Sequence, residues 1–351
     1  MTDCDRWRLR GPVRSCRIQR TWNVRRCGAD SCETETRGDT TILEFRAEGA
    51  LARRWHLNPD GSEWTSMYEY NGAGQLATVR TGNTAGAFDV HRYEYDAAGR
   101  LVLLVARVEG GADRIAERYE YDAVGRMKKT LYVDLAAQRP DTHYAWGVEG
   151  TDTTYSAHGA ATLTTFHNVR DQPIELLFHD TAGRPLSRVE FVYDEAGHLL
   201  EEAQTMMAEV MPPGILADMN PAQLEAVRAL LGGGGSPIRR LHRYDARGHR
   251  IESWSAVFGP LGRDRKTMDY NELGDQIEEI SEDEHREFSI DDQGRLSDRP
   301  SSESVTRSEA RFLYEYDARG NWIKKTVEAR GAADQDFFVS SIEQRTLAYD
   351  D

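Results

Sequence analysis

Tyr93-Glu94-Tyr95-Asp96-Ala97-Ala98-Gly99-Arg100-Leu101 is one copy of a short pattern that recurs along the chain. Tyr93 and Tyr95 are two residues apart, so in a strand their side chains share one face, and tyrosine has a high strand propensity. Asp96 can accept a hydrogen bond from the backbone N–H two residues on, which starts a turn. Gly99 can adopt a positive φ without strain. The pattern therefore predicts a β-hairpin with a type I turn closed by a glycine bulge.

The same spacing of aromatic residue, Asp or Asn, and Gly returns many times after residue 55. Clear copies span 68–76, 93–101, 119–127, 191–199, 244–249, 270–275, 288–296 and 314–322, and degenerate copies span 55–61, 167–172 and 179–184. One hairpin is marginal alone, but a meander of hairpins buries a common face. We therefore predict an all-β fold, a coiled antiparallel sheet of roughly twenty strands.

We interpret the Asp and Gly residues of five turns as structural turn residues rather than as a ligand array, because an Asp side chain caps its own turn. They are Asp96, Gly99, Asp122, Gly125, Asp194, Gly197, Asp245, Gly248, Asp317 and Gly320. The tyrosines before the turns, such as Tyr93 and Tyr119, are in the same way better explained by cross-strand packing than by stacking on sugars.

The pattern divides the chain into four segments. They are residues 1–54, 55–202, 203–237 and 238–351. The first lacks the motif and contains the four cysteines and two candidate strands, at 13–24 and 40–45. The second is the first part of the repeat sheet, in which the weak pattern of 135–160 predicts a loop-rich hairpin. The third is a helical insertion, and the fourth is the second part of the sheet. The helix is predicted by Asn220 as N-cap, Pro221 at the first helical position and Gly232 at the end. It is expected to pack on the sheet or cover its edge, with a lid or partner-binding element as the alternative.

All four cysteines lie near the N-terminus, at Cys4, Cys16, Cys27 and Cys32. Cys27 and Cys32 flank a plausible hairpin tip, so they are a candidate disulfide. Free, partly buried thiols are the leading alternative to this disulfide. A metal site is the third, although the spacing matches no common zinc module. A disulfide would imply an oxidising compartment.

The charge balance argues against nucleic acid as a partner. The net charge is −15, whereas phosphate contacts need Lys and Arg. No run of 18 apolar residues is present, so we expect no membrane insertion. No signal peptide is visible, which predicts a cytoplasmic protein as written and a secreted one if the chain has been trimmed.

The repeat residues quoted above resemble the YD repeat, so the chain is similar over about residues 55–351 to Rhs-type proteins, the C component of insecticidal toxin complexes, and teneurins. The ending 317–326 and 345–349 looks most like small stand-alone bacterial YD-repeat proteins. In the large relatives the repeats build a spiralling sheet that can close around a toxin, so the resemblance implies a spiralling sheet that forms an open or partly closed shell. Those relatives cut themselves at a motif containing Asp-Pro, and this sequence contains no Asp-Pro pair, so self-cleavage is not expected.

No catalytic, cofactor-binding or metal signature stands out. The chain contains no Gly-Lys pair, no G-x-S-x-G and no H-E-x-x-H, which excludes the usual phosphate loop, nucleophile elbow and zinc helix. The acidic run 282–287 is better explained as an exposed strand than as a cation site. Neighbouring acids such as Glu201 and Glu202 would lie on opposite strand faces, which makes them a poor catalytic pair.

Three functions follow as expectations. The first is a non-enzymatic scaffold or binding protein that engages another protein or a cell-surface glycan, because an extended repeat sheet offers a large surface. The second is an accessory of a polymorphic toxin system, either an immunity protein or a partial encapsulating shell. The third is a hydrolase whose site is assembled inside the curved sheet.

Overall fold

The protein is built almost entirely of strands. The computed structural model describes residues 3–27, 32–83, 86, 88–108, 110–132, 145–147, 154–156, 161–206, 238–257, 262–287, 300–332, 334 and 336–350. Within these ranges the chain forms the four-residue helix α1 (Asp3–Arg6) and strands β1 to β22. All strand pairings are antiparallel, which confirms the predicted all-β antiparallel sheet.

Residue contacts divide the chain into two units. Unit 1 comprises residues 1–116 and 309–351, and unit 2 comprises residues 117–308. The predicted segments divide the sequence by its motifs, whereas each unit gathers residues by contact. Unit 1 therefore combines the region before the repeats with the last repeats of the chain.

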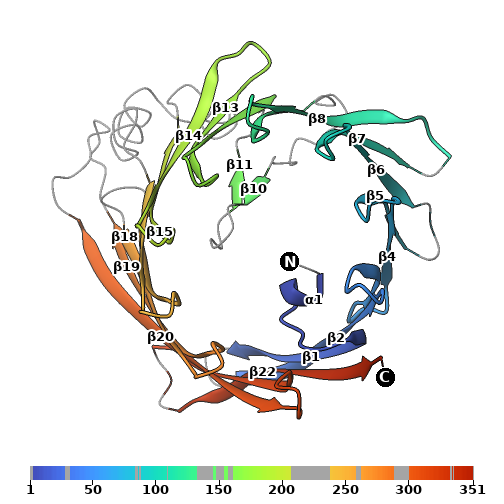
Figure 1. Ribbon diagram of the computed structural model, residues 1–351. Coiled ribbons are helices and arrows are strands. Elements are labelled where there is room, and N and C mark those ends of the chain that lie inside the picture. The colour runs from blue at the N-terminus through green and yellow to red at the C-terminus, as the bar shows by residue number, and fades with distance from the viewer. Residues whose placement is uncertain are drawn as a thin grey trace. The chain divides into compact units, whose positions relative to one another are not determined.

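Unit 1 contains both ends of the chain in one run of strands. Its strands are β1 (Val13–Cys27), β2 (Cys32–Phe45), β3 (Leu51–Leu57), β4 (Glu63–Tyr70), β5 (Leu76–Gly82), β6 (Asp89–Tyr95), β7 (Leu101–Val108), the second half of β20 (Ser302–Tyr316), β21 (Trp322–Arg330) and β22 (Phe338–Tyr349). Their order is β20-β21-β22-β1-β2 and then β3 to β7 in sequence. Strand β1 thus lies between β2 and the last strand, β22 (Figure 1).

Unit 2 is a meander in which each strand of the main sheet pairs with the next. Its strands are β8 (Arg114–Tyr121, from residue 117), β9 (Met127–Tyr132), β12 (Thr162–His167), β13 (Pro173–His179), β14 (Pro185–Tyr193), β15 (Leu199–Met206), β16 (Ile238–Tyr244), β17 (Arg250–Val257), β18 (Gly262–Tyr270) and β19 (Gln276–Glu287). The short strands β10 (Ala145–Gly147) and β11 (Thr154–Ser156) form a separate pair. They lie in the region 135–160, for which the sequence predicts a loop-rich hairpin.

The structure bears on two of the predicted boundaries. Residues 203–206 of the predicted helical insertion are the end of strand β15, and the predicted helix from Asn220 to Gly232 lies outside the described residues. Near the N-terminus, β2 begins at Cys32, eight residues before the predicted strand 40–45. Its first half is polar, so hydrophobicity gave no signal there, and pairing with β1 holds it extended.

The core of unit 1 is formed by the N-terminal segment packing on one face of β1 to β3. The buried residues of this cluster are Cys4, Leu9, Val13, Cys16, Ile18, Leu43, Phe45 and Leu51. In unit 2 the fully buried side chains Leu163, Phe178 and Val189 lie on one face of β12 to β14. The alternate residues of these strands face solvent, as the two-residue period of a strand requires.

Candidate functional site

The predicted turn residues form the hairpin turns and are engaged within them. Asp96 Oδ1 accepts hydrogen bonds from the backbone N–H of Ala98 at 3.0 Å and of Arg100 at 2.9 Å. The N–H of Gly99, at φ 80°, donates to the Asp96 carbonyl at 2.9 Å. The Arg100 guanidinium holds the pKa of Asp96 below its ordinary value. This is the geometry of a type I turn followed by a glycine bulge.

The other four turns repeat these contacts. The Oδ1 atoms of Asp122, Asp194, Asp245 and Asp317 accept from the backbone N–H four residues on, at 2.9, 2.8, 2.9 and 2.9 Å. The turn glycines Gly125, Gly197, Gly248 and Gly320 have φ of 89°, 95°, 83° and 78°. Hydrogen bonds inside the turn thus account for the carboxylates at these positions.

Successive hairpins are linked by the second tyrosine of the motif. The hydroxyls of Tyr95 and Tyr193 donate to the carbonyls of Leu76 and Pro173, each at 2.8 Å, one hairpin earlier in the chain. In addition, Gln172 Nε2 donates to the Gly197 carbonyl of the next turn at 2.8 Å. The hydroxyls of Tyr95 and Tyr193 therefore hold neighbouring hairpins together.

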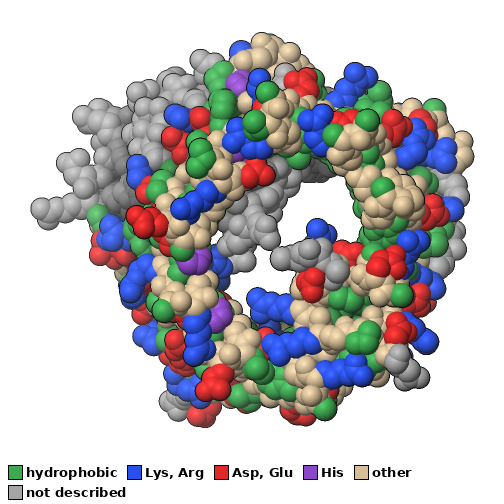
Figure 2. Space-filling model, viewed as in Figure 1, with side chains coloured by type: hydrophobic (Ala, Val, Ile, Leu, Met, Phe, Trp, Pro, Cys, Tyr) green, Lys and Arg blue, Asp and Glu red, His purple; other side chains and the backbone are tan. Residues whose placement is uncertain are grey.

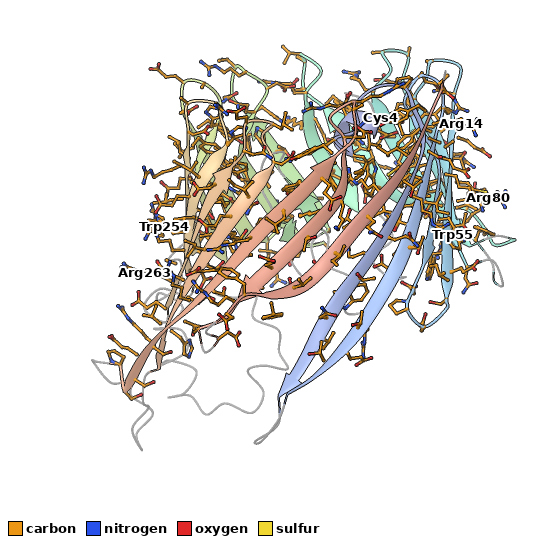
Figure 3. The ribbon with its side chains drawn as sticks, turned by 90° about the horizontal axis from the view of Figure 1, so that it is seen from below. Cys4, Arg14, Trp55, Arg80, Trp254 and Arg263 are labelled. Atoms are coloured by element: carbon orange, nitrogen blue, oxygen red, sulfur yellow. The ribbon has the colours of Figure 1, made fainter. Side chains whose placement is uncertain are left out.

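The groove we take as the candidate binding site lies on the exposed face of unit 2, over β17 to β20. It has a volume of about 390 Å³, and its walls include Trp254, Arg263, Glu282, Glu284 and Val305. Trp254 is 36% exposed and Val305 is 70% exposed. Figure 3 shows Trp254 and Arg263 on the same side of the sheet. An exposed indole in a cavity of this size suits a small ligand or the side chain of a partner.

A ladder of ion pairs crosses the floor of the groove. The Glu252 carboxylate binds Arg243 at 2.6 Å and Arg265 at 2.7 Å. The Glu282 carboxylate binds Arg265 at 3.5 Å and Arg307 at 3.3 Å. The Arg265 guanidinium lowers the pKa of Glu252, so this acid stays ionised near neutral pH. Basic and acidic side chains also alternate over the face seen in Figure 2.

A second polar cluster lies on the opposite, largely buried face of unit 2. Glu202 and His242 are 1% and 6% exposed, and Glu202 Oε1 lies 2.7 Å from His242 Nε2. Glu202 Oε2 is 3.8 Å from the guanidinium of Arg240. Within the described residues neither Glu202 Oε2 nor His242 Nδ1 has a hydrogen-bond partner. The cluster thus holds an acid–imidazole pair whose imidazole is hydrogen-bonded to no nucleophile.

The structure separates the two glutamates that are adjacent in sequence. Glu201 binds Arg239 at 2.6 Å on the exposed face, whereas Glu202 is buried on the other face. In the acidic run, Glu282 and Glu284 both pair with arginines, the latter with Arg286. Across the described ranges, no group of three or more His, Cys, Asp or Glu side chains is placed to hold a metal ion.

The cysteines divide into two pairs. The strand register places Cys27 opposite Cys32 at the tip of the β1–β2 hairpin, and the disulfide between them stays a prediction. Cys4 and Cys16 are free thiols in the core of unit 1. Burial raises the pKa of Cys16 to about 11, so this thiol is protonated and unreactive at neutral pH.

Sequence reasoning missed the residues of both clusters, because their neighbours come from different strands. One signal for the groove was present in the strand that reads Glu252-Ser253-Trp254-Ser255. The two-residue period of a strand places Trp254 on the same face as Glu252. Because charged side chains lie mostly at the surface, this indicates that the tryptophan is exposed. The register that brings Arg263 and Val305 beside it is not readable from the sequence.

These pairings and turns define a class of protein, an antiparallel sheet of repeated hairpins with Asp or Asn at the start of each turn and Gly at its end. No family model matches the chain, and no curated protein matches it. None of the helices in the described part of the chain is long and apolar enough to span a membrane.

Solved structures give a weak likeness. The chain is 14% identical to the chain in the crystal structure of TcdB2-TccC3-Cdc42, with a TM-score of 0.34, and the match covers 95% of this chain and 18% of that one. For TcdB2-TccC3 without its hypervariable C-terminal region the identity is 13% and the TM-score 0.29, and the match covers 95% of this chain and 18% of that one. For a porin-like protein from Bacteroides uniformis the identity is 11% and the TM-score 0.31, and the match covers 96% of this chain and 98% of that one. The chain thus spans about a fifth of the length of the toxin chains.

Proposed function

We propose that this protein is a non-enzymatic binding protein that engages another protein or a glycan through the groove at Trp254. The observation that carries the proposal is the exposed indole of Trp254 together with Val305 in a groove whose other lining residues are all charged. An aromatic anchor in a concave site with a polar rim is the usual centre of a recognition surface.

The ion-pair ladder supports the same proposal. Each glutamate on the floor of the groove is paired with two arginines, so these side chains already have partners before a ligand arrives. A surface that is already ordered loses little side-chain entropy on binding.

Affinity purification of the tagged protein from its native cells, with mass spectrometry, tests the proposal, and a glycan array tests sugars in parallel. We expect a stoichiometric component or a glycan that the wild type retains and Trp254→Ala loses. Trp64→Ala is the matched control, because Trp64 is also an exposed strand tryptophan, at 46%, but lies in unit 1. Equal binding by Trp254→Ala and the wild type would reject this groove as the site.

A second candidate function is an accessory of a toxin system. It is motivated by the repeated Tyr-x-Tyr-Asp-x-x-Gly residues, such as 93–99 and 119–125, that resemble those of toxin-associated YD-repeat proteins. The same purification separates the two candidates. A co-eluting toxin polypeptide that is retained by Trp254→Ala would favour the accessory function over binding at the groove.

A further inference from the structure

We infer that the groove at Trp254 selects an acidic polypeptide segment, one that carries a carboxylate next to an apolar or aromatic side chain. The inference rests on the proposed binding function and names its partner. It comes from the charges that the ion pairs leave unneutralised and from the two apolar side chains of the groove.

Two charged residues of the groove lining, Arg263 and Asp264, have no ion-pair partner within the described residues. The Asp264 carboxylate accepts a hydrogen bond from the Ser255 hydroxyl at 3.3 Å, and strand alternation places this pair on the opposite face from Arg263 and Trp254. Arg243, Arg265 and Arg307 are bound to the carboxylates of Glu252 and Glu282, and Arg286 is bound to Glu284. Arg263 is exposed, and within the described residues no carboxylate oxygen lies within 4.0 Å of its guanidinium. The other arginines on this face of β16 and β18, Arg239 among them, are each paired.

An unpaired guanidinium at the edge of a groove is a ready site for a carboxylate. Its planar fork offers parallel N–H donors, and such charge-assisted bonds are roughly twice as strong as neutral ones. Glu252, Glu282 and Glu284 are each paired with an arginine, so they repel an incoming carboxylate only weakly. Arg263 therefore gives the groove a local preference for an anion although the chain as a whole carries −15.

The apolar walls favour a peptide over a sugar acid. Val305 is 70% exposed and lines the groove with Trp254, and an isopropyl group makes no hydrogen bond to the hydroxyls of a sugar. The glutamates that would otherwise accept hydrogen bonds from sugar hydroxyls are held by arginines on the floor. A peptide supplies an apolar side chain for Trp254 and Val305 together with a carboxylate for Arg263.

The test is a peptide array read with the full-length protein. The array pairs ten-residue peptides that differ only in Glu or Gln beside a Leu, Phe or Trp, and hyaluronan and cellohexaose are spotted next to them. We expect the wild type to bind the Glu members about 10- to 100-fold more tightly than the Gln members, because the charged hydrogen bond is lost in the latter. Arg263→Gln should remove that difference.

Arg239→Gln is the matched control, an exposed arginine on the same face of unit 2 outside the groove, and it should keep the preference. Trp254→Ala should weaken binding of both peptide sets. Equal binding of Glu and Gln peptides, a preference that survives Arg263→Gln, or no peptide binding at all would overturn the inference. Binding of either oligosaccharide that requires Trp254 would also overturn it, while leaving the proposed binding function in place.

Discussion

At the scale of single residues, one side chain fastens both ends of the chain to the last repeat. Asn321 is 1% exposed and follows the glycine of the turn at Asp317. Its Oδ1 accepts from the Arg10 N–H at 2.6 Å, and its Nδ2 donates to the Arg10 carbonyl at 2.9 Å and to the Tyr349 hydroxyl at 2.8 Å. The same position holds Arg or His in other turns, so the motif alone would not reveal this role.

Replacing Asn321 by Ala should therefore destabilise unit 1. The change leaves the backbone polar groups of Arg10 without partners, and each buried group left unsatisfied costs about 1–3 kcal/mol. Urea unfolding should show the loss, and hydrogen exchange at residues 8–12 should accelerate. Gln75→Ala is the control, since Gln75 is an exposed turn residue whose amide nitrogen bonds the Gly99 carbonyl. Equal effects of the two variants would contradict the fastening role.

The tyrosines that link hairpins allow a second test. Tyr193 donates to the Pro173 carbonyl at 2.8 Å, and burial raises the pKa of Tyr193 to about 12, so its hydroxyl remains a donor well into alkaline solution. Tyr193→Phe should cost about 0.5–1.5 kcal/mol of unfolding free energy, the net value of one hydrogen bond. Tyr68→Phe removes a hydroxyl that makes no hydrogen bond to any described residue, so this variant should be nearly neutral. A neutral Tyr193→Phe in urea titrations would refute the link.

At the scale of elements, the hairpins were predictable and their neighbours in space were not. Asp96 and Gly99 are a local signal, because the turn they form is complete within a few residues. The pairing of β1 with β22 joins residues more than 300 positions apart, as in Val13 with Tyr349. No periodicity records such a pairing, and the polar first half of β2 gives no pattern either. For the same reason the sequence indicates the strand face on which Trp254 lies, but it does not show which residues of the neighbouring strands form the groove with it.

Glycine at position 38 is required by the contact between β1 and β2. A Cβ at Gly38 would lie 2.9 Å from the backbone carbonyl oxygen of Arg20, which the strand pairing fixes in place. Gly38→Ala should therefore destabilise this hairpin by about 1–3 kcal/mol, the usual cost of overpacking. Gly72→Ala, where a Cβ meets nothing within 4 Å, is the control and should be neutral to slightly stabilising. Circular dichroism melts of the two variants would decide.

At the scale of the whole molecule, stability should fall steeply in acid. Hydrogen bonds and ion pairs hold the pKa values of the turn aspartates Asp96 and Asp194 and of Glu252 below their ordinary values. The unfolded chain then binds more protons than the folded chain, so the free energy of unfolding decreases as pH falls from the ordinary carboxyl range, about 4, through the lower folded values. Urea midpoints between pH 6 and pH 3 measure this, and a flat or rising profile would contradict it.

The place of β1 between β2 and β22 has a consequence for how the protein is made. A ribosome adds about 5–20 residues per second, so β1 emerges roughly 20–70 s before Tyr349, the partner of Val13, has been synthesised. Throughout that interval one edge of the first strand is an open template for pairing with another nascent chain. Unit 1 therefore cannot complete its folding during translation until β22 has been synthesised. When many ribosomes translate the same mRNA at once, pairing between nascent chains through this edge should favour aggregation.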